Sequence, residues 1–170
     1  MTALSYAEIR PKIRGGDLMA LSYSPWHNWH DFQIQMVRSF TQSEYSHLGL
    51  ILDFGARLWV VEAVEPLVRL VPLSLYAVDG FFWIPMDAPM RGEEFVHALA
   101  RIGRAKYSKW QAVKAYFHLI QIGASDLVSC AEFVMECRRI SNVDMGDEAT
   151  PAAVIRHVGK PVWPVRGGEA

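Results

Sequence analysis

The chain has 170 residues, of which 51% are hydrophobic and 21% are charged, and its formal net charge is −1. This composition suits one globular domain and argues against disorder, and the absence of a basic stripe argues against a nucleic-acid partner. No apolar run reaches the length of a membrane span, and the first eight residues lack the features of a secretory signal. We therefore expect a cytoplasmic protein without a transmembrane segment.

The first half of the chain carries mostly strand patterns. Residues 1–16 are expected to form a short helix or arm that ends at Gly15-Gly16. The expected strands are residues 17–23, 47–52, 57–63, 68–73 and 80–85, and a helix is expected over 26–42. The strongest local signal is a hairpin, because residues 53–56 have turn composition and lie between two apolar runs.

The second half switches to helical patterns. Helices are expected over residues 92–104, 129–141 and 150–157, and residues 108–121 are expected to form a helix or a partly irregular segment. The tail 160–170 is expected to be mostly coil. Thr150 and Pro151 are typical of a helix N-cap followed by a first-turn proline. We therefore predict one α+β domain over 1–170, with its core at about 16–157 and a small antiparallel sheet packed against helices.

Cys130 is the first candidate for chemistry, because it begins the expected helix 129–141. Backbone N–H groups at a helix N-terminus favour thiolate over thiol, and the thiolate is the reactive species. The alternative is a buried structural cysteine, which is a common role for free Cys. Cys137 lies seven residues further along the same helix, too far away for a disulfide, and is expected to be structural. Two free thiols fit a reducing compartment.

His47 and Glu62 are the candidate base and its partner. His47 begins one strand of the expected hairpin, and Glu62 lies near the end of the other, so the two side chains are expected to meet at the open end. A carboxylate in this place can hold the imidazole in one tautomer and stabilise its charged form. The alternatives are a histidine satisfied by a backbone carbonyl and an edge-strand charge, and Glu65 competes with Glu62 for the contact.

Other candidates carry weaker signals. His27 and His30 have a metal-like spacing, but no Cys, Asp or Glu cluster completes a ligand set, so no metal site is predicted. There is no glycine-rich phosphate loop, and no cofactor is expected. Trp26 and Trp29 are more typical of a core, although they could form the rim of a pocket.

Several short motifs, taken in order, resemble a known family. They are Gly16-Asp17-Leu18-Met19, Tyr45-Ser46-His47-Leu48-Gly49-Leu50-Ile51, Val61-Glu62-Ala63-Val64-Glu65-Pro66, Tyr107, Ser129-Cys130-Ala131-Glu132-Phe133-Val134 and Thr150-Pro151. Together they are similar to the circularly permuted NlpC/p60-type cysteine hydrolases of the YiiX/YebB group, with lecithin:retinol acyltransferase as a more distant relative. The resemblance covers residues 16 to about 155.

The resemblance implies a papain-like fold with its thiol at a helix N-terminus. It assigns Cys130 as the nucleophile, His47 as the general base and Glu62 as the residue that orients the base. The Cys130 backbone N–H is the natural first oxyanion donor. Tyr45 and the loop near Asp17 are weaker candidates for a second donor, and Trp26 is a weak candidate for substrate contact.

Three functions stay open from the sequence. The first is a peptidase or amidase that acts on cell-wall-type peptides through an acyl-enzyme. The second is a lipid amidase or acyltransferase, which an apolar surface formed by Trp26, Trp29, Phe81, Phe82 and Trp83 would favour. The third is a binding module that keeps the fold without catalysis. The oligomeric state is not predicted.

Overall fold

The computed structural model describes residues 3–22, 45–104, 106–107 and 127–166. Its strands are β1 (Leu4–Ser5), β2 (Leu18–Leu21), β3 (His47–Asp53), β4 (Leu58–Val64), β5 (Leu67–Pro72), β6 (Phe81–Ile84), β7 (Lys106–Tyr107), β8 (Leu127–Val128) and β9 (Trp163–Arg166). Its helices are α1 (Tyr6–Ile9), α3 (Tyr76–Asp79), α4 (Gly92–Arg101), α6 (Cys130–Ile140) and α7 (Pro151–Val158), with the 3-10 turns η1 (Arg10–Lys12) and η2 (Leu73–Leu75).

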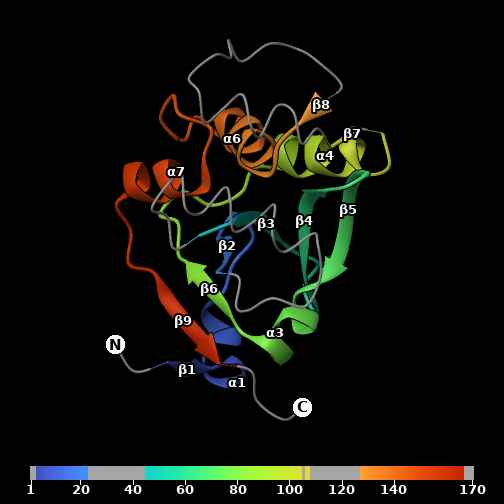
Figure 1. The fold of residues 1–170 in the computed structure, drawn as a ribbon. Coiled ribbons are helices and arrows are strands. Elements are labelled where there is room, and N and C mark those ends of the chain that lie inside the picture. The colour runs from blue at the N-terminus through green and yellow to red at the C-terminus, as the bar shows by residue number, and fades with distance from the viewer. Residues whose placement is uncertain (1–2, 23–44, 105, 108–126, 167–170) are drawn as a thin grey trace, which may run out of the picture.

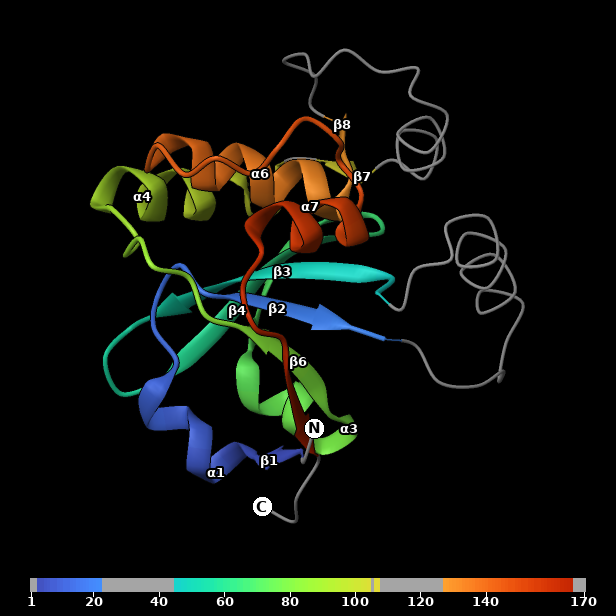
Figure 2. The ribbon, with the colours of Figure 1, turned by 90° about the vertical axis from the view of Figure 1, so that its left-hand side faces the viewer.

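One mixed sheet carries the fold. Its strand order is β1-β9-β6-β2-β3-β4-β5-β7-β8, and the pairs from β9 through β7 are antiparallel. The outermost pairs, β1 with β9 and β7 with β8, are parallel. Helices α4, α6 and α7 lie on one side of the sheet, while α1 and α3 lie on the other (Figure 1, Figure 2). The expected α+β class and the expected antiparallel strands are therefore confirmed.

The C-terminal tail differs from the sequence prediction. Residues 163–166 form β9, which pairs with β6 through Phe81 opposite Val165 and Trp83 opposite Trp163. A proline within this short run weakens the strand pattern, so the strand could not be recognised without its partner. The helix expected over 92–104 ends earlier, at Arg101. The helices expected over 26–42 and 108–121 lie outside the described residues.

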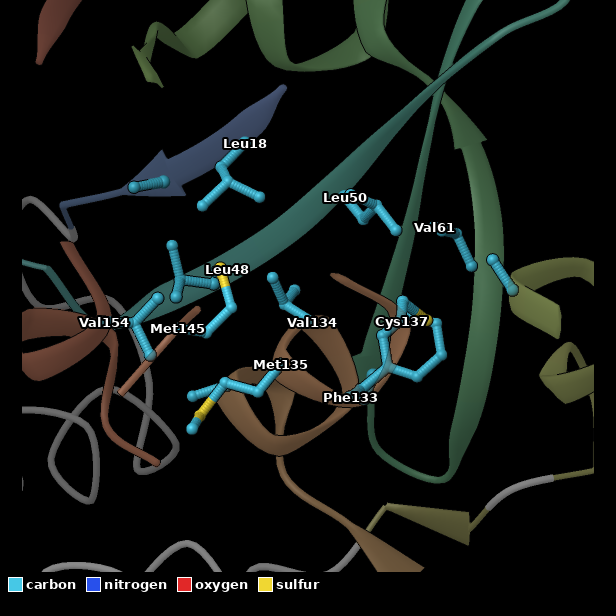
Figure 3. Packing of buried hydrophobic residues seen from close by; sticks show 14 of the residues in the cluster. Leu18, Leu48, Leu50, Val61, Phe133, Val134, Met135, Cys137, Met145 and Val154 are labelled. Atoms are coloured by element: carbon cyan, nitrogen blue, oxygen red, sulfur yellow. The ribbon is translucent and has the colours of Figure 1, made fainter. Parts of the chain in front are cut away.

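Alternation along β3 separates two cores. Leu48, Leu50 and Leu52 belong to the cluster that packs against α6, whereas Ile51 belongs to the cluster on the opposite face. Figure 3 shows the first cluster, in which strand residues such as Leu48 and Leu50 face Val134 and its neighbours on α6. Because successive strand residues point to opposite faces, this register holds α6 against the centre of the sheet.

The start of α6 is held by a capping box. Ser129 is the N-cap, and its Oγ accepts a hydrogen bond from the Glu132 backbone N–H at 3.2 Å. In return, Glu132 Oε2 accepts the Ser129 backbone N–H at 2.7 Å. These reciprocal bonds satisfy two donors at the helix start and make Cys130 the first helical residue.

A buried ion pair secures the other end of α6. Arg138 Nη1 lies 3.0 Å from both carboxylate oxygens of Glu94 on α4, and neither side chain is exposed to solvent. Arg138 Nη2 donates to the Ala88 carbonyl at 2.7 Å, and the Ser141 hydroxyl also contacts the Glu94 carboxylate. The pair thus ties α6 to α4 and to the segment that precedes α4.

We predict that Arg138→Met destabilises the protein by about 3–5 kcal/mol, because it leaves the Glu94 carboxylate buried and uncompensated. Urea unfolding followed by circular dichroism measures this loss. The double variant Arg138→Met/Glu94→Leu removes both charges and should regain much of the stability. If the double variant is at least as unstable as the single one, unpaired charge is not the cause.

Candidate active site

The β3–β4 hairpin brings His47 and Glu62 together. Leu50 pairs with Val61, so the same register places Gly49 opposite Glu62. His47 lies two residues before Gly49 in β3, and its side chain is therefore on the same face of the sheet as Glu62. Diagonal neighbours of this kind are within reach of long side chains. His47 Nε2 lies 2.6 Å from Glu62 Oε2, and the Glu62 side chain is only 1% exposed. The predicted meeting of these residues is therefore observed.

Gly49, opposite Glu62, lies where a side chain would collide with the neighbouring strands. A Cβ atom built at this position would lie 2.4 Å from Val60 Cγ1 and 3.2 Å from Met19 Cε. Valine is stiff about its side chain, so it cannot easily move away from an added methyl group. Glycine at this position thus allows Val60 and Met19 to pack closely against the β3 backbone.

Cys130 approaches His47 from α6. The side chains of Cys130 and His47 are hydrogen-bonded, and the backbone N–H groups of Leu48 and Ala131 also act on the thiol. Because His47 Nε2 faces Glu62, the nitrogen left for Cys130 is Nδ1. The three residues form a chain of contacts from Cys130 at the start of α6, through His47 on β3, to the buried Glu62 on β4.

The pKa values of these groups favour an ion pair. Burial raises the pKa of the Cys130 thiol, but the His47 charge, its hydrogen bond and the nearby backbone N–H groups bring it below its ordinary value. Burial lowers the pKa of His47, but the Cys130 and Glu62 contacts outweigh it and raise that pKa to about 10. Groups this tightly coupled titrate as a unit, and both shifts favour a thiolate beside an imidazolium.

Glu62 has two further partners that sequence analysis missed. Arg69 on β5 donates from Nε to Glu62 Oε1 at 2.8 Å, and the Tyr76 hydroxyl on α3 contacts the same oxygen. Burial raises the pKa of Glu62, but the bonds to His47, Tyr76 and Arg69 together lower it to about 2. Arg69 lies directly opposite Glu62 in the β4–β5 pairing. The two expected strands 57–63 and 68–73 contain these residues, so pairing them about the intervening turn could have indicated the contact.

The other predicted site residues are placed as follows. Glu62, rather than Glu65, contacts His47. Tyr45 lies two residues before His47, and its ring packs edge-on against Phe82 with centroids 5.2 Å apart. Trp26 lies outside the described residues.

Asp17 is not brought to the site. It lies beside Ile51, at the end of β3 away from His47. Its buried carboxylate accepts hydrogen bonds from Trp83 Nε1 and from the Met86 backbone N–H, each at 2.9 Å. Asp17 therefore ties the start of β2 to β6 and to the segment after it. Its position does not support the expected role as an oxyanion or substrate residue.

Of the five aromatic residues that would form an apolar surface, the structure describes Phe81, Phe82 and Trp83. Phe81 and Trp83 are buried in the core cluster on the α1 side of the sheet, and Trp29 lies outside the described residues. Cys137 is fully buried within α6, and burial raises the pKa of its thiol. Cys130, in contrast, has the His47 imidazole beside it.

The described residues bear on metal binding and on membrane insertion. Within these residues, no group of three or more His, Cys, Asp or Glu side chains is arranged to hold a metal ion. In the same part of the chain, no helix has both the length and the apolar character needed to cross a bilayer.

A thiol at a helix N-terminus beside a histidine on a sheet strand is the papain-like arrangement that the resemblance implied. The fold is similar to that of the metalloprotein YiiX from Escherichia coli O157:H7, with a TM-score of 0.57 and 18% sequence identity. This similarity covers 79% of the present chain and 69% of YiiX. It confirms the expected YiiX-like fold. No family model matches the chain, and no curated protein matches it.

We predict that the stabilising effect of Glu62 disappears in acid. Its pKa is about 2 in the folded protein against an ordinary 4.5, so its contribution is complete above pH 4.5 and is lost as the pH falls toward 2. The difference corresponds to about 3 kcal/mol. Chemical unfolding of the wild type and Glu62→Gln at several pH values measures it. The stability gap between the two proteins should narrow below pH 4.5, and a constant gap would contradict the assignment.

Proposed function

We propose that the protein is a cysteine hydrolase that cleaves an amide bond through a covalent acyl-enzyme. The observation that carries this proposal is the contact chain Cys130–His47–Glu62, in which a thiol at a helix N-terminus meets an imidazole held by a buried carboxylate. A nucleophile beside a base that is itself oriented by a third group is the general signature of covalent catalysis. The YiiX-like fold supports a hydrolase but does not by itself specify the reaction.

In the proposed reaction, the Cys130 thiolate attacks the carbonyl carbon of the substrate. The π electrons of the carbonyl move to its oxygen, and the Cys130 backbone N–H at the helix start donates to the oxyanion. The C–N bond then breaks, and the leaving amine takes the proton from the His47 imidazolium. A thioester to Cys130 and a neutral His47 remain.

Water resolves the thioester. His47 removes a proton from the water as its oxygen attacks the acyl carbon, and the C–S bond breaks to return the thiolate. The carboxylic acid leaves, and the site again holds a thiolate beside an imidazolium. Glu62 keeps Nε2 of His47 occupied throughout, so the other ring nitrogen stays directed at the reacting atoms.

The proposed substrate is a small peptide or related amide, such as a cell-wall-type peptide. The lipid alternative rested on a broad aromatic surface, and Phe81 and Trp83 are buried instead. YiiX is described as a metalloprotein, but the described part of this chain offers no fitting group of metal ligands, and the proposed steps use none.

We expect Cys130 to react with iodoacetamide well below the pH at which an ordinary thiol reacts, because its thiolate is stabilised by His47 and backbone N–H groups. Alkylation of the folded protein from pH 4 to 9, with mass spectrometry to separate the two cysteines, measures this. His47→Ala should slow the reaction of Cys130 at pH 6 by about tenfold or more. Cys137 should stay unreactive until the protein unfolds.

Cys137→Ser is the matched control and should leave the reaction of Cys130 unchanged. If Cys130 titrates as an ordinary thiol, or is inert in both the wild type and His47→Ala, the hydrolase proposal fails and a binding module is favoured. An activated Cys130 justifies intact-mass trapping of the acyl-enzyme with peptide amides and long-chain acyl amides in parallel. Trapping only the long-chain acyl group would overturn the peptide assignment.

A further inference from the structure

Both oxygens of the Glu62 carboxylate have hydrogen-bond partners, including the oxygen that faces away from His47. Oε2 contacts His47, whereas Oε1 accepts from Arg69 Nε at 2.8 Å and from the Tyr76 hydroxyl. Arg69 Nη2 also donates to the Tyr76 oxygen at 3.4 Å, which links the two donors. The proposed reaction assigns no role to either Arg69 or Tyr76.

Both donors come from outside the β3–β4 hairpin. Arg69 stands directly opposite Glu62 on β5, and Tyr76 begins α3, which follows β5 through the turn η2. Glu62 is 1% exposed, but the Arg69 side chain is 54% exposed. The network therefore runs from the buried carboxylate to a cation in contact with solvent.

The charges alternate along this network. A thiolate at Cys130, an imidazolium at His47, a carboxylate at Glu62 and a guanidinium at Arg69 follow one another, with each contact joining opposite signs. A carboxylate that has only His47 as a charged partner would hold the imidazole proton more tightly. A general acid that binds its proton too tightly is a poor donor to a leaving group.

We propose that Arg69 and Tyr76 are positioning residues of the candidate active site, which anchor Glu62 Oε1 and share its negative charge so that His47 can release its proton. This inference rests on the proposed hydrolase function. Arg69 and Tyr76 touch neither Cys130 nor the reacting atoms, and they act through Glu62.

Within the described residues, the ionisable groups that act on His47 and Glu62 come from four elements. They are Cys130 from α6, Glu62 from β4, Arg69 from β5 and Tyr76 from α3. Among these groups, Arg69 carries a positive charge. Removing that charge therefore shifts the pKa of His47 in a definite direction. The imidazolium loses a repelling cation and faces a less neutralised carboxylate, and both changes raise the pKa of His47.

The test is the titration of His47 in the full-length protein, followed by nuclear magnetic resonance of ¹⁵N-labelled histidine side chains. The chain has six histidines, and the His47 signal is assigned by its loss in His47→Ala. Arg69→Gln should move the His47 titration to higher pH by about half a unit. Arg69→Lys keeps the charge and should restore most of the wild-type value.

Tyr76→Phe supplies a second variant without any change of charge. It removes one donor from Glu62 Oε1, leaves Arg69 as the other anchor, and should also move the His47 titration upward. Arg57→Gln is the matched control, since Arg57 is exposed at the opposite end of the hairpin and should leave the titration unchanged. Thermal unfolding of each variant verifies that it is folded.

The outcomes separate the two proposals. A wild-type His47 that titrates near its ordinary value, together with an unreactive Cys130, overturns the hydrolase function. A raised wild-type value that is unchanged or lowered in both Arg69→Gln and Tyr76→Phe overturns the role of these two residues alone. An upward shift in Arg69→Gln that Arg69→Lys reverses supports it, because a purely structural role would not depend on charge.

Discussion

The buried carboxylate of Glu62 is the constraint on which the candidate site depends. Burial of an ionised group with 1% exposure costs free energy unless its oxygens are hydrogen-bonded. The Glu62 carboxylate has three hydrogen-bond partners, each from a different element. Those partners are His47, Arg69 and Tyr76, and together they fix the relative positions of β3, β4, β5 and α3. The same contacts that make the charge tolerable also orient the imidazole toward Cys130.

Rigid elements bring the thiol to this point. The capping box of Ser129 and Glu132 determines where α6 begins, and the leucines of β3 determine where the helix lies on the sheet. At the other end of α6, the buried pair of Arg138 and Glu94 ties the helix to α4. The proposed role of Cys130 as a nucleophile requires this kind of support, because small displacements weaken the hydrogen bond that activates a thiol.

Much of this arrangement could be predicted from local patterns. The hairpin, a helix that begins near Cys130 and a meeting of His47 with an acidic residue at the open end of the hairpin follow from periodicity, turn composition and register. The strand β9 could not be predicted, because it is recognisable only beside β6. Tyr76 could not be predicted either, since the short helix α3 carries no sequence signal that places it beside Glu62.

The sequence by itself determined the class of fold, the identity of the candidate nucleophile and base, and the choice of strands that carry them. The class of fold and the strands depend on short-range rules, namely side-chain alternation and hairpin pairing, whereas the roles of Cys130 and His47 come from the resemblance of their motifs to a known family. Only the tertiary structure decided that Glu62 rather than Glu65 meets His47, that Asp17 supports β6 instead of the site, and that Phe81 and Trp83 are buried. Those outcomes depend on how β5, β6, α3 and α6 pack around the hairpin, and distant packing of this kind leaves no periodic pattern in the chain.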